Sequence, residues 1–445
     1  MKPTTLEQAA QWAGGTARGT GIITHVTTDS RAAGKGSLFV ALRGSRVDGH
    51  AFAAEVLARD GYAMVRPGVV DMAGVIEVED TLRGLQSLAR GYLAQFELPV
   101  VAVTGSNGKT TTKNMIARVL REAFVVHSTT ENYNNELGVP LSVLGLEEGH
   151  QVLVVEMAMR GLGQIRELTQ ICPPTAAVIT NVGPVHFELL GSMENIAQAK
   201  GEILDPLPAS GFAVLNGDDP LVRSLASRTA AEVVFFGRSR GNDLTIADLR
   251  TDKQGRVSFA VKGLGVEGEV SLNVPGIHNA WNAAAALAVG LKLGVPFAQC
   301  RQALGDVALS SMRLEEVQTP SGAVILNDAY NASPASMRAA LDTLARMECS
   351  GRRVAILGDM LELGRISHDA HFEVGARAAE VCDALYFVGR WAESLRDGAG
   401  RGEIFATVED LLNNLPAVQA GDVVLVKASR GMQLERVVQR LQGGE

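Results

Sequence analysis

Short runs of consecutive apolar residues alternate along the chain with stretches whose apolar positions recur at helical spacing. A short apolar run bounded by turn residues predicts a fully buried strand. In the middle of the chain such runs occupy residues 98–103, 151–156, 176–180 and 212–216, and helical patterns, including residues 110–122, lie between them. This alternation is typical of a parallel sheet covered by helices.

The last part of the chain repeats this organisation, with apolar runs at residues 323–327, 353–357, 384–388 and 423–427. Between the first two, residues 334–347 predict a helix with one apolar face. That face consists of Met337, Ala340, Leu341, Leu344 and Met347. The first part is more mixed, with apolar runs at 37–42 and 62–65 before a helical stretch at 82–96. Residues 240–275 alternate polar and apolar positions, which predicts antiparallel strands.

We therefore predict an α/β protein of three domains. They comprise residues 1–80, residues 81–312 around a central parallel sheet, and residues 313–445 as a second, Rossmann-like α/β unit. The length of 445 residues agrees with this division, because domains average about 150 residues.

Composition narrows the classes of function. Hydrophobic residues make up 46% of the chain and charged residues 20%, which is ordinary for a globular protein and too apolar for disorder. The formal net charge is −8, which argues against nucleic-acid binding through a broad basic surface. The four cysteines are scattered without a CxxC pair, so neither a zinc site nor a dithiol motif is expected.

Two features bear on localisation. The longest apolar stretch, residues 283–291, is too short to span a bilayer. The first residues lack the basic segment and apolar core of a signal peptide. We expect a cytoplasmic protein that acts as a monomer, without membrane insertion.

The stretch TGSNGKTT, residues 104–111, joins a predicted buried strand to a predicted helix. Backbone amides at such a glycine-rich turn and helix start can cradle phosphate oxygens. In that arrangement Lys109 reaches the β- and γ-phosphates and the Thr110 hydroxyl ligates magnesium. The usual spacing would place glycine where this chain has Val103, so the loop is a shorter variant. An ordinary glycine turn is the alternative. The predicted phosphate-binding residues are Thr104, Gly105, Ser106, Asn107, Gly108, Lys109, Thr110 and Thr111.

Glu156 ends one of the buried apolar runs. A carboxylate at this place commonly holds magnesium in enzymes with phosphate-binding loops. The alternative is a carboxylate that caps a strand or pairs with a nearby lysine. The middle domain is therefore predicted to bind ATP.

Further motifs surround this loop in the sequence. They are TNVGPVH at 180–186, MENIAQAKGEIL at 193–204, GIHNAWNAAAA at 276–286, SSMRLE at 310–315 and LNDAYNASP at 326–334. In this order and spacing they make nearly the whole chain resemble the Mur ligases, the ATP-dependent amide-forming enzymes of peptidoglycan synthesis. NYNNELGVPLSVL at 132–144 and LGDMLELG at 357–364 are similar to the last cytoplasmic ligase of that series. The chain departs from the family pattern at Ser333, where asparagine is usual.

The resemblance implies amide synthesis through an acyl phosphate. The peptide carboxylate of UDP-N-acetylmuramoyl-tripeptide would attack the γ-phosphate of ATP, and the amine of D-alanyl-D-alanine would then displace phosphate. The implied catalytic residues are Lys109, His186, Lys200 and Arg313. The implied magnesium ligands are Thr110, Glu156, His186 and Lys200, with Lys200 carrying carbon dioxide as a carbamate. A solvated lysine and a satisfied core histidine are the alternatives for Lys200 and His186.

The resemblance also implies the remaining contacts. Asn282 would face adenine, unless it caps the helix that follows, a role that Asn279 could also fill. Arg313 would contact the γ-phosphate, and Asp328 the ribose or Arg313; a surface ion pair is the alternative for each. The first domain would bind the uridine diphosphate end of the substrate, although its TDSR sequence at 28–31 also fits a helix cap or turn. The predicted substrate-binding residues are Ser30, Arg31, Asp48, His50, Asn132, Asn134, Asn135, Asn331, Ser333, Ser429 and Arg430.

Other functions remain open at this point. Within the enzymes, the alternatives are the related tripeptide synthetase and a folylpolyglutamate-like ligase. Outside them, the alternative is an ATP-binding switch without catalysis. Whether the third residue of the peptide is lysine or diaminopimelate is also open.

Overall fold

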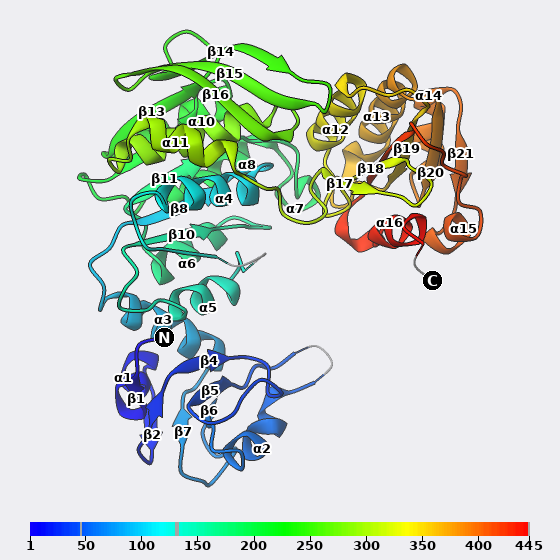
Figure 1. The fold of residues 1–445 in the computed structure, drawn as a ribbon. Helices are drawn as coiled ribbons and strands as arrows, with labels where there is room; N and C mark the ends of the chain where they lie inside the picture. Colours follow the sequence, from blue (N-terminus) through cyan, green and yellow to red (C-terminus); the bar gives the residue numbers. More distant parts are fainter. Residues whose placement is uncertain (45–46, 130–132, 444–445) are drawn as a thin grey trace.

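The computed structural model describes residues 1–44, 47–129 and 133–443. It is a mixed α/β structure with a five-stranded, a nine-stranded and a six-stranded sheet, which follow one another along the chain. Figure 1 shows the first sheet in blue below the second, and the third, in yellow to red, to one side of the second. The predicted α/β class is confirmed.

The N-terminal unit has its sheet in the order β2-β7-β6-β5-β4. The strands are β2 (Thr16–Arg18), β4 (His25–Thr27), β5 (Ser37–Val40), β6 (Tyr62–Val65) and β7 (Val75–Glu77), with β1 (Thr4–Thr5) and β3 (Ile22–Ile23) forming a separate pair. The helices are α1 (Leu6–Ala13), α2 (Ala53–Leu57) and α3 (Thr81–Leu93). Helix α3 packs against α1 and against α5 of the central unit, and so joins the two units.

The central sheet has the order β16-β15-β14-β13-β12-β11-β8-β10-β9. Its strands are β8 (Val100–Thr104), β9 (Val126–Ser128), β10 (Val152–Glu156), β11 (Ala176–Ile179), β12 (Phe212–Asn216), β13 (Glu232–Gly237), β14 (Leu244–Thr251), β15 (Arg256–Gly263) and β16 (Val266–Pro275). The strands from β9 to β14 pair in parallel, and β14, β15 and β16 are antiparallel. The antiparallel prediction for residues 240–275 is confirmed.

Helices cover both faces of the central sheet. They are α4 (Lys109–Leu120), α5 (Gly138–Leu144), α6 (Gln164–Ile171), α7 (Phe187–Leu190), α8 (Met193–Gly201), α9 (Pro220–Ser224), α10 (Asn279–Lys292) and α11 (Phe297–Gly305). Strand β8 shows why its apolar run is continuous: Val100 and Ala102 face one hydrophobic core, and Val101 and Val103 face the other. Successive side chains of a strand point to opposite faces, so a strand between two layers is apolar at every position.

The C-terminal unit has the strand order β17-β18-β22-β19-β20-β21. Its strands are β17 (Glu315–Gln318), β18 (Val324–Asn327), β19 (Arg353–Gly358), β20 (Ala384–Val388), β21 (Glu403–Phe405) and β22 (Val423–Lys427), and its helices are α12 (Pro334–Arg346), α13 (Ser367–Val381), α14 (Ala392–Ala399), α15 (Val408–Asn413) and α16 (Glu435–Leu441). All neighbours pair in parallel except β17 with β18. The predicted division at residues 80 and 312 stays a prediction.

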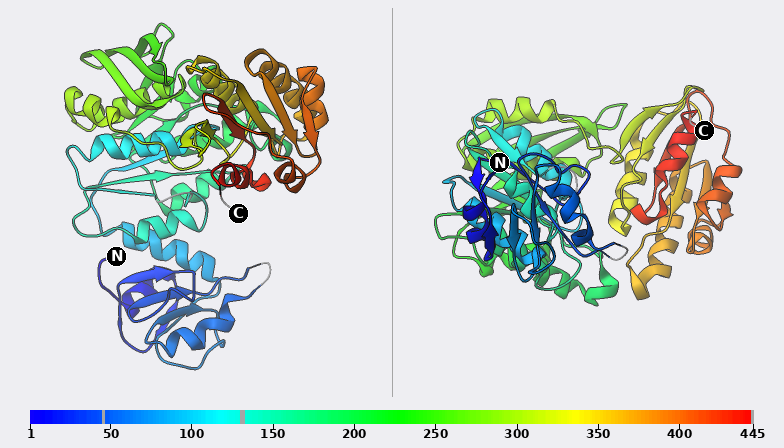
Figure 2. Two further views of the ribbon diagram at one scale, coloured as in Figure 1. Left: turned by 45° about the vertical axis from the view of Figure 1, so that its right-hand side comes forward. Right: turned by 90° about the horizontal axis from the view of Figure 1, so that it is seen from below.

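Contacts between the C-terminal and central units come from places far apart in the sequence. The backbone amide of Glu348 donates to the carbonyl of Lys253 at 2.8 Å, and their side chains form an ion pair at 3.0 Å. On the other side, Arg365 donates to the carbonyl of Gly191 at 3.3 Å. Both views in Figure 2 show the two units side by side.

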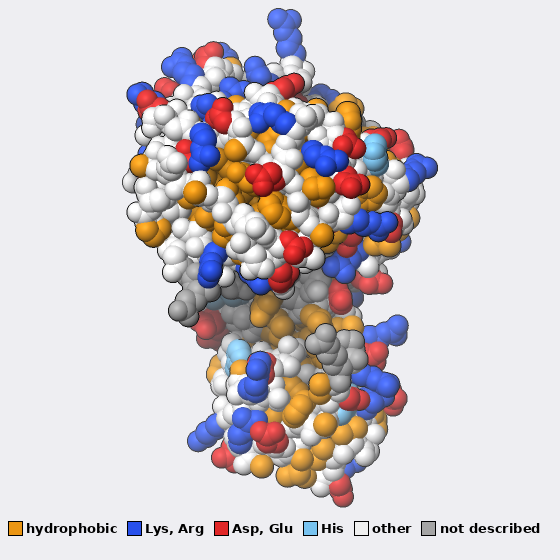
Figure 3. All heavy atoms as spheres, turned by 90° about the vertical axis from the view of Figure 1, so that its right-hand side faces the viewer, with side chains coloured by type: hydrophobic (Ala, Val, Ile, Leu, Met, Phe, Trp, Pro, Cys, Tyr) orange, Lys and Arg blue, Asp and Glu red, His pale blue; other side chains and the backbone are white. Residues whose placement is uncertain are grey.

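The surface, the helices and the cysteines have three further features. On the face shown in Figure 3, lysine and arginine are interspersed with aspartate and glutamate and do not gather into one basic patch. None of the described helices combines the length and apolar character needed to cross a membrane. Cys172, Cys300 and Cys382 are buried and Cys349 is half-buried, all as free thiols.

Candidate functional site

The loop between β8 and α4 has a backbone that glycine alone accommodates at two positions. Gly105 has φ 152° and Gly108 has φ 80°. A Cβ at Gly105 would lie 1.9 Å from Thr180 Oγ1, and one at Gly108 would lie 2.5 Å from Asn282 Oδ1. Either substitution would clash and, in this region of φ, strain the backbone. The sequence therefore fixes a tight turn directly before a helix.

Residues after β11 hold this loop in place. Asn107 donates its backbone amide to Asn181 Oδ1 at 2.9 Å, and Asn181 Nδ2 donates back to the Asn107 carbonyl at 3.0 Å. Thr180 Oγ1 donates to the same carbonyl at 2.6 Å. Ser106 exchanges hydrogen bonds with the Gly183 backbone. These hydrogen bonds fix the conformation of the loop. The first amides of α4 have no acceptor within the helix, so they can donate to a ligand.

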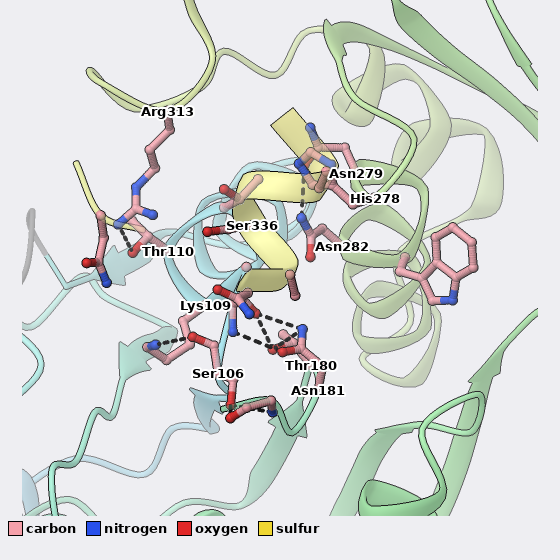
Figure 4. Close-up of a pocket in the computed structure, with 18 of the residues that line it drawn as sticks. Ser106, Lys109, Thr110, Thr180, Asn181, His278, Asn279, Asn282, Arg313 and Ser336 are labelled. Carbon is pink, nitrogen blue, oxygen red and sulfur yellow. Dashed lines mark hydrogen bonds between the residues drawn. The ribbon is translucent and has the colours of Figure 1, made fainter. Parts of the chain in front are cut away.

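Helix α4 begins at Lys109, and its N-cap Gly108 supplies no side-chain cap. The first N–H groups of a helix carry partial positive charge and lack intrahelical partners. Lys109 lies beside them, with its amine donating to the carbonyls of Gly105 at 3.0 Å and Ser106 at 3.3 Å. This is the geometry of a phosphate cradle. Figure 4 shows Ser106, Lys109 and Thr110 around it.

A buried carboxylate lies next to the cradle. Glu156, at the end of β10, is 1% exposed. Its Oε2 accepts from Thr110 Oγ1 at 2.7 Å, and its Oε1 accepts from Asn134 Nδ2 at 2.7 Å. The strand order places β10 beside β8, so the ends of both strands converge here. The structure thus brings together Thr110, Asn134 and Glu156, which were selected separately from the sequence.

The cradle opens into a cavity of about 730 Å³ between the central and C-terminal units. Most of the predicted nucleotide, metal and catalytic residues line it; Thr104, Gly105 and Lys200 do not. Of the predicted substrate residues it is lined by Asn134 and Asn331. Thr104 is fully buried, and its hydroxyl has no hydrogen-bond partner among the described residues. A volume of this size suits a nucleotide-sized ligand.

Arg313 reaches the cradle from the start of the C-terminal unit. Its Nη2 donates to Thr110 Oγ1 at 3.0 Å, and Figure 4 shows the two side chains pointing toward one another. Its guanidinium lies 4.0 Å from the centre of the Tyr330 ring. Met312 and Leu314 on either side have φ of 59° and 51°, so the segment is held in an uncommon conformation. The alternative interpretation of Arg313 as part of a surface ion pair is therefore wrong, and the γ-phosphate contact stays a prediction.

Ser333 supplies a second link between the units. Its hydroxyl donates to Asn107 Oδ1 at 2.9 Å and accepts from the amide of Ser336, as part of a capping box at the start of α12. Serine and asparagine are comparably good N-caps. The departure from the family pattern at this position therefore keeps the cap and brings a contact to the phosphate loop.

Lys200 lies in α8 and is 2% exposed. Burial, together with the charge of Lys109, lowers the pKa of Lys200 well below its usual value. Burial also lowers the pKa of Lys109, against the influence of Glu156. The interpretation of Lys200 as a solvated surface charge is therefore wrong. Burial disfavours the charged form of an amine.

His186 stands between the two units. Its Nδ1 forms a hydrogen bond with Glu362 Oε2, and Glu362 also lies 4.0 Å from the Arg160 guanidinium. Burial lowers the pKa of His186, while Glu362 acts in the opposite direction. The amide of Glu188 donates to the Glu362 carbonyl at 3.1 Å. The loop that carries Glu362 therefore docks directly on the start of α7.

The structure gives Asp328 an ion-pair partner other than the Arg313 side chain. Its Oδ2 pairs with Lys427 Nζ at 2.6 Å, and its Oδ1 accepts from the backbone amide of Leu314 at 3.2 Å. Lys427 is 2% exposed and also donates to the Asn331 carbonyl at 2.8 Å. Asp328 thus fixes the backbone next to Arg313 without pairing with its side chain. A contact of Asp328 with ribose stays a prediction.

Asn282 lies against the phosphate loop. Its Oδ1 accepts from Thr112 Oγ1 at 3.1 Å. Its Nδ2 donates to Asn279 Oδ1 at 2.9 Å, as Figure 4 shows. The N-cap of α10 is His278, which makes no side-chain cap. Asn279 Nδ2 donates to the Pro275 carbonyl at 2.7 Å. The alternative in which either asparagine caps this helix is therefore wrong, and the adenine contact stays a prediction.

The predicted uridine diphosphate residues lie in the N-terminal unit, away from the cavity lining. Arg31 is 89% exposed and pairs with Asp29 at 2.7 Å, and the pair lowers the pKa of Asp29 to about 2. His50 is buried; its Nδ1 contacts Asp48 at 2.6 Å and its Nε2 accepts from the Arg66 amide at 3.3 Å. His50 is thus part of the local structure. Ser30 accepts at its carbonyl from Arg59.

Other predicted substrate residues make local contacts. Ser429 accepts from the Leu361 amide at 2.9 Å, and Arg430 pairs with Glu435 at 2.8 Å. Asn135 accepts from two backbone amides before α5. Asn132 lies outside the described residues. Their roles toward a substrate stay predictions.

Several residues of the site were not selected from the sequence. Lys427 ends a buried strand just as Glu156 does, and a charged residue at the carboxyl end of a parallel strand is the signal that could have found it. Tyr330 and Glu362 lie inside the motifs LNDAYNASP and LGDMLELG, but their partners belong to other parts of the chain. Trp281 lies inside GIHNAWNAAAA and lines the cavity.

Known proteins match the chain along nearly its whole length. Three family profiles match in order: the Mur ligase family catalytic domain at residues 22–92, the Mur ligase middle domain at 103–290, and the Mur ligase glutamate ligase domain at 312–430. The UDP-N-acetylmuramoyl-tripeptide–D-alanyl-D-alanine ligase of Bacillus subtilis (strain 168) is 38% identical over 432 residues, which cover 94% of this chain and 93% of the relative.

Solved structures agree with this match. A crystal structure of MurF from Acinetobacter baumannii superposes with a TM-score of 0.91 at 30% identity, covering 100% of this chain and 99% of that one. The MurF ligase of Thermotoga maritima in complex with ADP superposes with a TM-score of 0.84 at 32% identity, covering 94% and 97%.

Proposed function

The chain belongs to the Mur ligase family and is an ATP-dependent ligase, and we propose that it joins D-alanyl-D-alanine to the peptide carboxylate of UDP-N-acetylmuramoyl-tripeptide. A relative with that name matches 94% of the chain. The structural observation that carries the proposal is the single cavity in which a phosphate cradle of the central unit meets Arg313 of the C-terminal unit. The reaction belongs to peptidoglycan precursor synthesis, and a cytoplasmic location is part of the proposal.

The first half-reaction brings two anions together, the peptide carboxylate and the γ-phosphate. Positive groups must therefore surround the phosphoryl group and be fixed before the reaction. Lys109 and the first amides of α4 lie at the cradle, and the Arg313 guanidinium reaches it at Thr110; together they would supply this charge. Arg313 comes from the other unit, so closure of the two units completes the set and excludes water from the acyl phosphate.

The site also fits magnesium. Mg²⁺ prefers oxygen ligands and is usually bound by one or two carboxylates together with substrate phosphates. The Thr110 hydroxyl and the Glu156 carboxylate, 2.7 Å apart and buried, form such a donor set. Among the described residues, no group of three or more His, Cys, Asp and Glu side chains gathers at this site or at any other. When bound, the ion would neutralise charge on the phosphate oxygens. Asn134 holds the Glu156 carboxylate in place.

Lys200 and His186 fit a second magnesium position. A neutral amine is the form that adds carbon dioxide, and the low pKa of Lys200 favours that form. A carbamate would turn the lysine into an oxygen donor. A histidine that binds metal usually donates its other ring nitrogen to a carboxylate, and Glu362 accepts such a bond from His186 Nδ1. Carbamylation of Lys200 is therefore part of the proposal.

The N-terminal unit would hold the uridine diphosphate end of the substrate, where Arg31 offers an exposed guanidinium to phosphate oxygens. The D-alanyl-D-alanine end would lie near Asn331, which lines the cavity. The protein would act as a monomer.

A substrate panel tests the proposal directly. Phosphate release is measured with ATP, UDP-N-acetylmuramoyl-tripeptide carrying either lysine or diaminopimelate, and D-alanyl-D-alanine, single amino acids or glutamate as amine. We expect release with D-alanyl-D-alanine alone among the amines, and a product heavier by the dipeptide less water in mass spectrometry. The variant Lys109→Met, similar in length but uncharged, should be inactive.

The same panel separates the alternatives. Release with a single amino acid would favour the tripeptide synthetase, and release with glutamate a folylpolyglutamate-like ligase. ATP turnover that is independent of the amine would indicate a switch or an ATPase and would contradict the proposal.

A further inference from the structure

Next to the phosphate cradle, the cavity is lined by apolar side chains of the central unit. Trp281 in the first turn of α10 directly precedes Asn282, whose side chain lies against Gly108 of the cradle. Phe236 at the end of β13 and Ile277 line the same cavity. A nucleotide whose phosphates occupy the cradle would therefore have an aromatic ring within reach of its base.

One hydrogen bond fixes the orientation of the Trp281 ring. The indole Nε1 donates to Asp218 Oδ2 at 2.8 Å. Asp218 is itself held by the backbone amides of Arg238 at 2.7 Å and Ser239 at 2.8 Å, and by Asn242 Nδ2 at 3.2 Å. A carboxylate accepts about four hydrogen bonds, so this one is saturated by protein donors. Asp218 is therefore unavailable to a ligand. It influences the cavity only by holding the indole of Trp281.

The backbone of this region is shaped around the carboxylate. Gly237 has φ 146°, and a Cβ there would lie 2.5 Å from the Asp218 carboxylate. Partial burial opposes the charge on Asp218, but the amides of Arg238 and Ser239 and the indole outweigh it and keep the pKa of Asp218 below its usual value. Asp218 is thus a fixed acceptor. With its nitrogen bonded to Asp218, the apolar part of the indole is what Trp281 can offer to the cavity that it lines.

Helix α12 of the C-terminal unit supplies another part of the lining. It contributes the small side chains Ser336, Ala339, Ala340 and Thr343, and Asp342 and Arg346 also line the cavity. Small residues leave room for a flat ring between α12 and α10, whereas larger ones would fill it. The base-binding space would therefore have one aromatic wall and one small-residue wall, each from a different unit.

We propose that Trp281 stacks on the purine base of ATP and that Asp218 is the positioning residue that holds its ring in the stacking orientation. The inference deepens the ATP-dependent activity and does not depend on which amine the enzyme uses. Stacking of a base on an aromatic ring is sequence-tolerant and changes affinity by roughly five- to more than a hundredfold on loss of the ring. The phosphate contacts are separate from it.

The test compares a ligand with a base and one without. Dissociation constants for ADP and for inorganic tripolyphosphate are measured by calorimetry on the full chain without the peptide substrate, so that failure of the proposed ligase reaction does not affect the result. The variants are Trp281→Leu, Trp281→Phe, Asp218→Asn and the double variant Asp218→Asn/Trp281→Phe. Trp12→Phe, in the N-terminal unit against Tyr92, is the control, and thermal unfolding confirms that each variant is folded.

For Trp281→Leu we expect ADP binding to weaken about tenfold or more, with tripolyphosphate binding unchanged. Trp281→Phe keeps a ring without the N–H donor, so its loss should be smaller. Asp218→Asn should match Trp281→Phe, and the double variant should lose no more than either single one. Equal weakening of both ligands, unchanged ADP binding in Trp281→Leu, or additive losses in the double variant would overturn the proposal.

Discussion

Substitution of Arg313 probes whether charge from the C-terminal unit drives phosphoryl transfer. The guanidinium donates to Thr110 Oγ1 at 3.0 Å and stacks on the Tyr330 ring at 4.0 Å. Asp328 fixes the adjacent amide of Leu314, and the Tyr330 amide donates to the Met312 carbonyl at 3.1 Å. The side chain is therefore positioned before substrate arrives, which is the condition for strong electrostatic stabilisation of a transition state.

The magnitude follows from what each substitution removes. Arg313→Ala removes a fixed charged donor, and loss of one such donor typically costs about 3–4 kcal/mol, or roughly 100- to 1000-fold in kcat. Arg313→Lys keeps the charge but loses the planar fork and most of the stacking. A cation–π contact contributes about 0.5–2 kcal/mol, so we expect a loss of roughly tenfold. Tyr330→Leu, which removes the ring alone, should lose a similar or smaller factor.

The assay is steady-state phosphate release with both co-substrates saturating, combined with the dissociation constant of ADP. Arg338→Ala is the matched control, because Arg338 forms an exposed ion pair with Glu373 at 3.0 Å on the same helix that Ser333 caps. Exposed pairs contribute about 0–1 kcal/mol, so this variant should keep full activity. ADP binding should change little in Arg313→Ala, because ADP lacks the γ-phosphate. A kcat above one tenth of wild type in Arg313→Ala would refute the reasoning, and so would an Arg313→Lys variant as weak as Arg313→Ala.

Two further predictions concern stability and the link between the units. Ser333→Ala removes the cap of α12 and the bond to Asn107, so we expect about 1 kcal/mol less stability in urea unfolding and a severalfold higher KM for ATP; Ser333→Asn should keep the stability, and an equal loss in both variants would contradict the capping argument. His371 is buried, its Nε2 accepts from the Met360 amide at 2.9 Å, and burial lowers its pKa. In the unfolded chain the His371 imidazole is protonated below about pH 6.5, whereas in the native chain it stays neutral to lower pH. The free energy of unfolding should therefore fall as the pH drops from 7 to 5, and it should fall less steeply in His371→Gln. An equal dependence on pH in both proteins would contradict this role of His371.

Local patterns in the sequence predicted the elements well. The apolar runs at 212–216, 384–388 and 423–427 coincide with β12, β20 and β22, and the helix predicted at 334–347 is α12. These elements are buried on both faces or along one clear stripe, so their pattern carries the information. The phosphate loop was also predictable, because strand, glycine turn and helix are contiguous and each has a local cause.

Pairings between distant residues were not predictable from the pattern. Arg313 and Thr110 are 203 positions apart, and His186 and Glu362 are 176 apart. Asp328 shows the difficulty most clearly, because its partner Lys427 lies in a strand that reads as purely structural. Which of several candidate cations a carboxylate meets depends on strand order, and the strand order β18-β22-β19 does not follow the sequence.

The charges of the site indicate why closure and substrate binding are coupled. Burial lowers the pKa of Lys109 and of Lys113 in α4, and Arg313 lowers both further. Glu156 acts in the opposite direction on Lys109 and Lys113. Buried positive charges with only one nearby carboxylate are unfavourable, so they oppose the close approach of the two units. An anionic triphosphate supplies the missing negative charge, so the same lysines that disfavour an empty closed site stabilise a filled one.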